Sequence, residues 1–142
     1  MVAEGLKDLL VAAGVGVFKA ETGWTIQIGR EPTEPDTAIS IWETGGFPPS
    51  SAWLLDFPTA QIRVRGARNG YQAARSKMRD VKDALLGIDS QDLNGDRWVA
   101  INMLSDIVWL GYSEEELPQF TANFQLIIQP ATTALSSRTA IT

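Results

Sequence analysis

The chain has 142 residues, of which 44% are hydrophobic and 20% charged, so it can bury one core of ordinary size. It contains neither cysteine nor histidine, which excludes disulfides, thiolate nucleophiles and sulfur-based zinc sites and removes the side chain best suited to acid–base catalysis near neutral pH. Its net charge of −5 argues against a general nucleic-acid binder.

The first third of the chain predicts one helix, two strands and a loop. Apolar residues recur at helical spacing over residues 2–13, and Gly14 follows as a stop signal. Alternating apolar residues predict strands over residues 24–28 and 39–42. The glycines and adjacent prolines of residues 45–51 then predict a long exposed loop without regular structure.

The rest of the chain predicts a longer helix and most of a sheet. A strand over residues 60–65 precedes an amphipathic helix over residues 71–87. Asn94-Gly95 predicts a turn rather than a hairpin, because the residues before it are too polar for a convincing strand. Residues 98–104 and 107–112 predict a pair of strands, and residues 120–129 predict a closing strand.

These elements favour a two-layer α+β sandwich, with two helices on one face of a mostly antiparallel sheet of about four to five strands. Residues 1–130 are expected to form a single α+β domain. Residues 131–142 are small, polar and without periodicity, which predicts a flexible C-terminal tail.

Two acidic segments invite a catalytic or metal-binding interpretation. Residues 92–96 resemble the start of a calcium loop, but Arg97 and Met103 stand where an EF-hand needs glycine and glutamate. The three glutamates at 114–116 are typical of a solvated connection rather than a catalytic pair. We therefore expect no catalytic residue, no cofactor and no metal.

Five tryptophans suggest core or interface material more than a ligand platform. Trp42 lies on the strand face opposite its apolar neighbours, and Phe47 and Trp53 flank the Pro-Pro loop. Because exposed aromatic residues are costly without a use, we expect Trp42, Phe47 and Trp53 to contact a partner.

Basic residues are concentrated between positions 63 and 82. Seven of the 12 Lys and Arg lie there against Asp80 alone, which leaves +6 in this segment and −11 in the rest of the chain. Arg75, Arg79 and Lys82 share one helix face. With Arg63 and Arg65 they form a candidate subunit interface; the alternative is a solvated face balanced by acids of the same monomer.

The layout also resembles a known family. The matching parts are the helix at 2–13, the strand at 59–66, the helix beginning near Tyr71, the segment Leu110-Gly111-Tyr112 and the closing strand from Phe120. Together they resemble the tail terminator, or minor capsid, proteins of long-tailed bacteriophages. The turn at 113–118 departs from the longer acidic-glycine turn of that family, so contacts made there do not transfer.

The resemblance implies a structural virion protein of the tail or neck, made in the host bacterial cytoplasm. It implies a homo-oligomer, a hexameric ring, that caps the finished tail tube and joins it to the head. Its partners would be the tail tube protein and a head-completion or neck protein. It implies no sequence-specific nucleic-acid contact, although DNA could pass through the ring.

Two other functions stay open at this point: another head–tail connector or neck protein, and a small cytosolic enzyme or regulator. No membrane contact is expected, because the longest apolar stretches are far below the about 20 residues that a membrane span needs.

Overall fold

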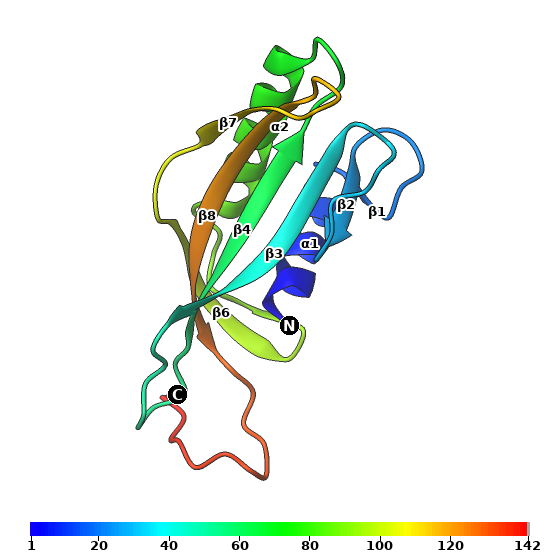
Figure 1. Ribbon diagram of the computed structural model, residues 1–142. Helices are drawn as coiled ribbons and strands as arrows, with labels where there is room; N and C mark the ends of the chain where they lie inside the picture. Colours follow the sequence, from blue (N-terminus) through cyan, green and yellow to red (C-terminus); the bar gives the residue numbers. More distant parts are fainter. Residues whose placement is uncertain (142) are drawn as a thin grey trace.

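The structure, a computed structural model, describes residues 1–141 and contains two helices and eight strands in that range (Figure 1). The elements in chain order are α1 (Val2–Ala12), β1 (Val17–Phe18), β2 (Thr25–Ile28), β3 (Ala38–Phe47), β4 (Phe57–Arg65), α2 (Tyr71–Leu85), β5 (Gln91–Leu93), β6 (Asp96–Met103), β7 (Val108–Tyr112) and β8 (Pro118–Gln129). The α+β class and both predicted helices are confirmed.

One sheet contains all eight strands in the order β1-β2-β3-β4-β8-β6-β5, with β7 also paired to β8. The prediction of about four to five strands was therefore wrong. The sheet curls into a half-barrel, and its added strands include β1 and β5, which have only two and three residues. Such short strands carry no alternation that a sequence pattern could reveal.

The long strand β8 organises one half of the sheet. β4 runs antiparallel along one side of it, while β6 and β7 follow each other along the other side. Trp98 of β6 lies opposite Ile128, and Trp109 of β7 lies opposite Phe120. The predicted pairing of residues 98–104 with 107–112 was therefore wrong, because both segments pair with β8 instead of with each other.

Two glycine-containing segments proved more regular than predicted. Asn94 and Gly95, with φ of 54° and 88°, connect β5 and β6 as a hairpin rather than an isolated turn. The polar residues of β5 are tolerated because this strand lies at the end of the sheet. Similarly, β3 continues through Gly45 and Gly46 to Phe47 with a bulge, so residues 45–47 are strand and not loop.

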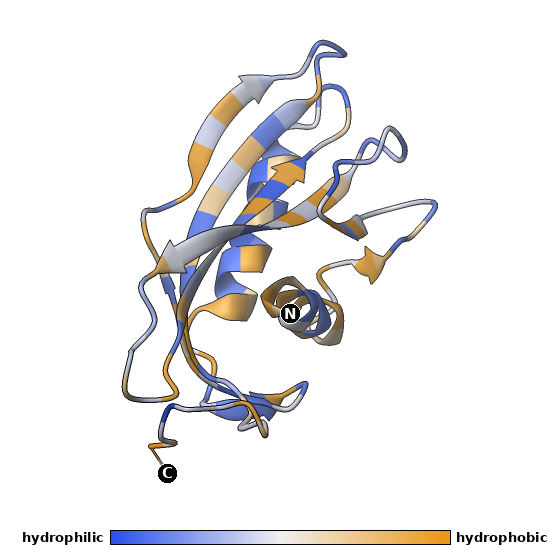
Figure 2. Cartoon of the chain, turned by 60° about the horizontal axis from the view of Figure 1, so that its bottom comes forward, coloured by the Kyte–Doolittle hydropathy of each residue, from blue (hydrophilic) through white to orange (hydrophobic). Residues whose placement is uncertain are grey.

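The core lies between the sheet and the two helices. Figure 2 looks nearly along α1, which lies inside the curve of the sheet beside α2. Leu6 and Leu10 of α1 and Met78 and Leu85 of α2 are fully buried there. Gly5 is buried on the same side of α1, where an added Cβ would overlap the indole of Trp98. Both helices thus keep close contact with the sheet.

Candidate subunit and partner contact surfaces

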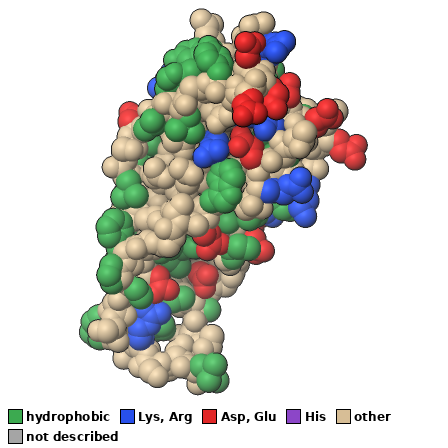
Figure 3. Space-filling view, viewed as in Figure 1, with side chains coloured by type: hydrophobic (Ala, Val, Ile, Leu, Met, Phe, Trp, Pro, Cys, Tyr) green, Lys and Arg blue, Asp and Glu red, His purple; other side chains and the backbone are tan. Residues whose placement is uncertain are grey.

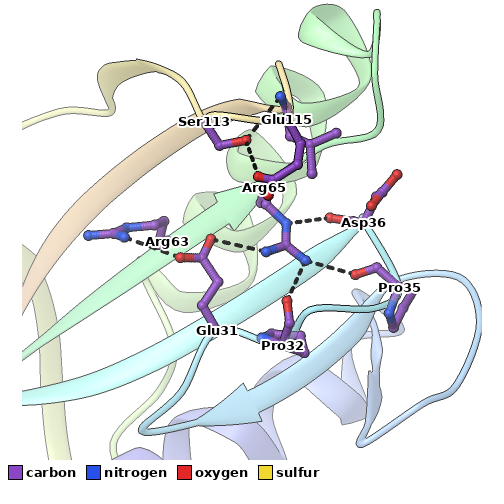
Figure 4. Close-up of polar contacts among 9 residues, drawn as sticks. Glu31, Pro32, Pro35, Asp36, Arg63, Arg65, Ser113 and Glu115 are labelled. Atoms are coloured by element: carbon purple, nitrogen blue, oxygen red, sulfur yellow. Dashed lines mark hydrogen bonds and ion pairs between the residues drawn. The ribbon is translucent and has the colours of Figure 1, made fainter.

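Arg65 of β4, one of the predicted interface residues, is buried within its own chain (Figure 4). Its Nε donates to the carbonyl oxygen of Asp36 at 2.8 Å, and its Nη2 donates to those of Pro32 and Pro35 at 2.7 and 2.9 Å. A guanidinium suits this role, because its planar fork offers several donors in fixed directions. Arg65 thereby fastens the connection between β2 and β3 to the sheet.

Arg63 lies on the same uncovered face of β4 and is only partly exposed. Its Nη1 lies 3.3 Å from Oε2 of Glu31, and its guanidinium lies 5.2 Å from the ring centroid of Trp42. Trp42 is correspondingly half-buried under this cation. The charge of Arg63 and the ring of Trp42 thus both have partners in the same chain.

Arg75, Arg79 and Lys82 form the predicted stripe on the outer face of α2. Arg79 is 3.7 Å from Asp83 one turn later, and both side chains are exposed. Lys82 Nζ is 3.0 Å from Asp106, in the connection between β6 and β7. The backbone N–H of Ile107, then Lys82 and the nearby charge of Arg75, lower the pKa of Asp106 below its ordinary value of 3.8.

No ion pair of Arg75 is present among residues 1–141. The stripe is therefore partly neutralised by its own chain at Arg79 and Lys82, while Arg75 retains a free positive charge.

Phe47 ends β3, and Trp53 lies within the connection between β3 and β4, at the end of the molecule where the C-terminus lies (Figure 1). Each of these two side chains is 50% exposed. The C-terminal segment crosses this connection: Arg138 Nη1 lies 2.8 Å from Asp56 Oδ1, and Thr139 pairs with Trp53 in a parallel bridge. The loop is held in place while its aromatic side chains remain available.

An aromatic cluster joins β7 to the start of α2, and the sequence analysis did not single it out. The rings of Tyr71 and Trp109 are 4.9 Å apart, those of Trp109 and Tyr112 are 5.1 Å apart, and Phe120 lies beneath them in the core. The run Val-Trp-Leu-Gly-Tyr, without a charge or a proline, was the available signal.

The acidic residues of the segment 92–96 lie in and around the β5–β6 hairpin. Asp92 is paired with Arg97 at 3.4 Å across the β5–β6 hairpin. Across residues 1–141, no three acidic side chains lie close enough together to hold a metal ion. Neither helix in the same range is long and apolar enough to cross a membrane.

Comparison with known proteins gives a family and a structural neighbour. The family model described as "Bacteriophage tail terminator protein" matches residues 9–130. Among solved structures, a chain of the "Virion of native gene transfer agent (GTA) particle" shares this fold, with a TM-score of 0.70 and 17% sequence identity over 90% of this chain and 94% of that chain. No curated protein matches the sequence significantly.

The family match extends from within α1 to the end of β8, so it includes the last turn of α1, all of α2 and all eight strands. It concerns a structural phage protein and not an enzyme family. The chain therefore belongs to the bacteriophage tail terminator family and is a structural phage protein of tail completion.

Proposed function

We propose that this protein assembles into a hexameric ring that caps the finished tail tube and then joins the tail to the head. The family match over residues 9–130 is the observation that carries this proposal. The ring would be made in the host bacterial cytoplasm, would act without catalytic turnover, cofactor or metal, and would leave room for DNA to pass.

Subunit contacts in this ring involve the stripe of Arg75, Arg79 and Lys82. Arg75 supports this role best, since it has no ion pair among residues 1–141. Arg63 and Arg65 contribute indirectly, by holding the connection between β2 and β3 against the uncovered face of the sheet. Exposed ion pairs contribute only about 0–1 kcal/mol each, so apolar contacts must supply most of the affinity.

Contact with the tail tube or the adjoining neck ring involves the loop with Phe47 and Trp53. Trp42 lies earlier on β3, the strand that leads into this loop. Two half-exposed aromatic rings on a loop that the C-terminal segment holds in place suit such a contact. Aromatic side chains bury a large area at a partner surface, and an ordered loop loses little conformational entropy on binding.

The test replaces residues 48–53 with a Gly-Ser segment of equal length and supplies this variant to a phage that lacks the gene. We expect a folded protein by circular dichroism but no infectious particles, with unfinished or headless tails in electron micrographs. The control is an equal-length replacement of the exposed residues 132–135, which should support normal particles. Normal infectivity of the loop variant would contradict the proposed contact.

A further inference from the structure

The C-terminal strap, defined as residues 138–141, lies on a backbone edge in the connection between β3 and β4. Within it, Thr139 pairs with Trp53 in a parallel bridge. The N–H of Thr139 donates to the carbonyl oxygen of Ala52, and its carbonyl oxygen accepts from the N–H of Leu54, both at 2.9 Å. The strap thus adds a short strand to an edge that presents one acceptor and one donor to an extended chain.

One ion pair sets the position of the strap on this edge. Arg138 is the only charged side chain in residues 117–142. Asp56 is the only one in residues 44–62. These two side chains meet at 2.8 Å, and Arg138 Nη1 also lies 3.1 Å from the carbonyl oxygen of Ser50. The lowest part of the molecule in Figure 3, where the C-terminus lies, is mostly hydrophobic or uncharged, so this carboxylate selects a segment that carries a cation.

The strap can leave this edge without unfolding the domain. Residues 131–135, which lead to it, are all exposed, and residues 131–141 contribute no side chain to the hydrophobic core. Its attachment consists of the two backbone hydrogen bonds of Thr139 and the contacts of the Arg138 guanidinium. Segments held by a few such contacts open locally far more often than the core unfolds.

We propose that the strap is a releasable lock on a strand-accepting edge, where it stands in for an extended, cation-bearing segment of the partner protein. The strap itself shows the chemistry that fits: an extended backbone beside Ala52 and Leu54, and a cation on Asp56. A partner segment with arginine or lysine in the place of Arg138 would make the same contacts by strand addition. This inference rests on the proposed partner contact of the loop and names how the partner engages it.

The first test uses a synthetic peptide of residues 136–141 as the probe, in titrations followed by the backbone NMR shifts of Leu54 and Asp56. The released variant, Arg138→Ala with Thr139→Pro in the otherwise intact chain, lacks the cation of the strap and the N–H that pairs with the edge. It should stay folded by circular dichroism. It should bind the peptide at least about tenfold more tightly than the wild type, whose own strap competes from within the same chain.

The matched control is Arg68→Ala, which removes the arginine of another ion pair, 3.5 Å from Glu116, in the connection between β4 and α2. This control should bind the peptide as weakly as the wild type. Equal binding by the released variant and the wild type, or no shift in either at millimolar peptide, would overturn the lock.

The second test exchanges the charge of the edge. Asp56→Lys in the released variant should stop binding of the wild-type peptide and favour a peptide that carries Arg138→Asp. In the phage complementation assay, Asp56→Lys alone should abolish infectious particles, because the cation of the partner would meet a like charge.

Two outcomes of the complementation assay separate this inference from the proposed function. Normal infectivity of Asp56→Lys beside a defective replacement of residues 48–53 would overturn the lock and leave the loop contact standing, whereas normal infectivity of both variants would overturn both. Wild-type oligomers that the peptide dissociates would mean that the strap of a second copy fills the edge, and would overturn the partner segment.

Discussion

Single residues in this protein act through the partners that the fold gives them. Arg63 and Arg65 belong to the same run of basic residues as Arg75, yet Arg65 is 8% exposed and donates three hydrogen bonds to backbone carbonyls. Arg75 has no ion pair within residues 1–141. Equal formal charges therefore differ in their surroundings: Arg65 holds a loop, whereas Arg75 is free for the proposed subunit contact.

Arg65→Ala should destabilise the protein by about 2–3 kcal/mol, because three buried or half-buried carbonyl oxygens would lose their donor. Arg65→Lys should recover little of this, since an ammonium cannot reproduce the planar fork. Urea unfolding followed by tryptophan fluorescence measures both changes. The control Arg79→Ala, whose side chain is 74% exposed, should change stability by less than about 0.5 kcal/mol, and an equal effect of both would contradict this role.

At the scale of elements, the C-terminal segment contacts the rest of the fold, but residues 131–141 contribute no side chain to the hydrophobic core. Leu135 is 92% and Ile141 48% exposed, whereas Arg138 and Thr139 bind the connection between β3 and β4. Thr142 lies outside the described residues. Flexibility of residues 131–142 stays a prediction, and these contacts suggest where the segment would rest when it is ordered.

Deletion of residues 136–142 should leave the melting temperature nearly unchanged, because none of the side chains described at 136–141 is fully buried. Hydrogen exchange at Leu54 should accelerate, since its N–H donates to the carbonyl oxygen of Thr139 at 2.9 Å. Arg138→Ala serves as a milder companion variant, because it keeps the backbone bond between Leu54 and Thr139. A large loss of melting temperature would mean that the segment supports the whole fold.

On the scale of the whole molecule, charge is distributed unequally between surfaces. The net charge of −5 combines +6 in residues 63–82 with −11 elsewhere. In the proposed ring, such separation would favour one relative orientation of neighbouring copies.

The double variant Arg75→Glu with Arg79→Glu should slow ring formation more at low salt than at high salt. Added salt screens exposed charges over about 10 Å at 0.1 M, so the penalty should shrink as ionic strength rises. Light-scattering kinetics at two salt concentrations measures the difference. Identical assembly rates of variant and wild type at low ionic strength would mean that the stripe is only a solvated face of the monomer.

The sequence by itself determined both helices, the central strands and the family resemblance, because apolar periodicity and the order of elements are local properties of the chain. The pairing of β6 and β7 with β8, the burial of Arg65 and the contact of Tyr71 with Trp109 were decided only by the tertiary structure. Paired residues are 6 to 13 positions apart between β7 and β8 and 21 to 32 apart between β6 and β8, and Tyr71 and Trp109 are 38 apart. Local periodicity does not specify such partners, because their registers depend on how the whole sheet curls around the helices.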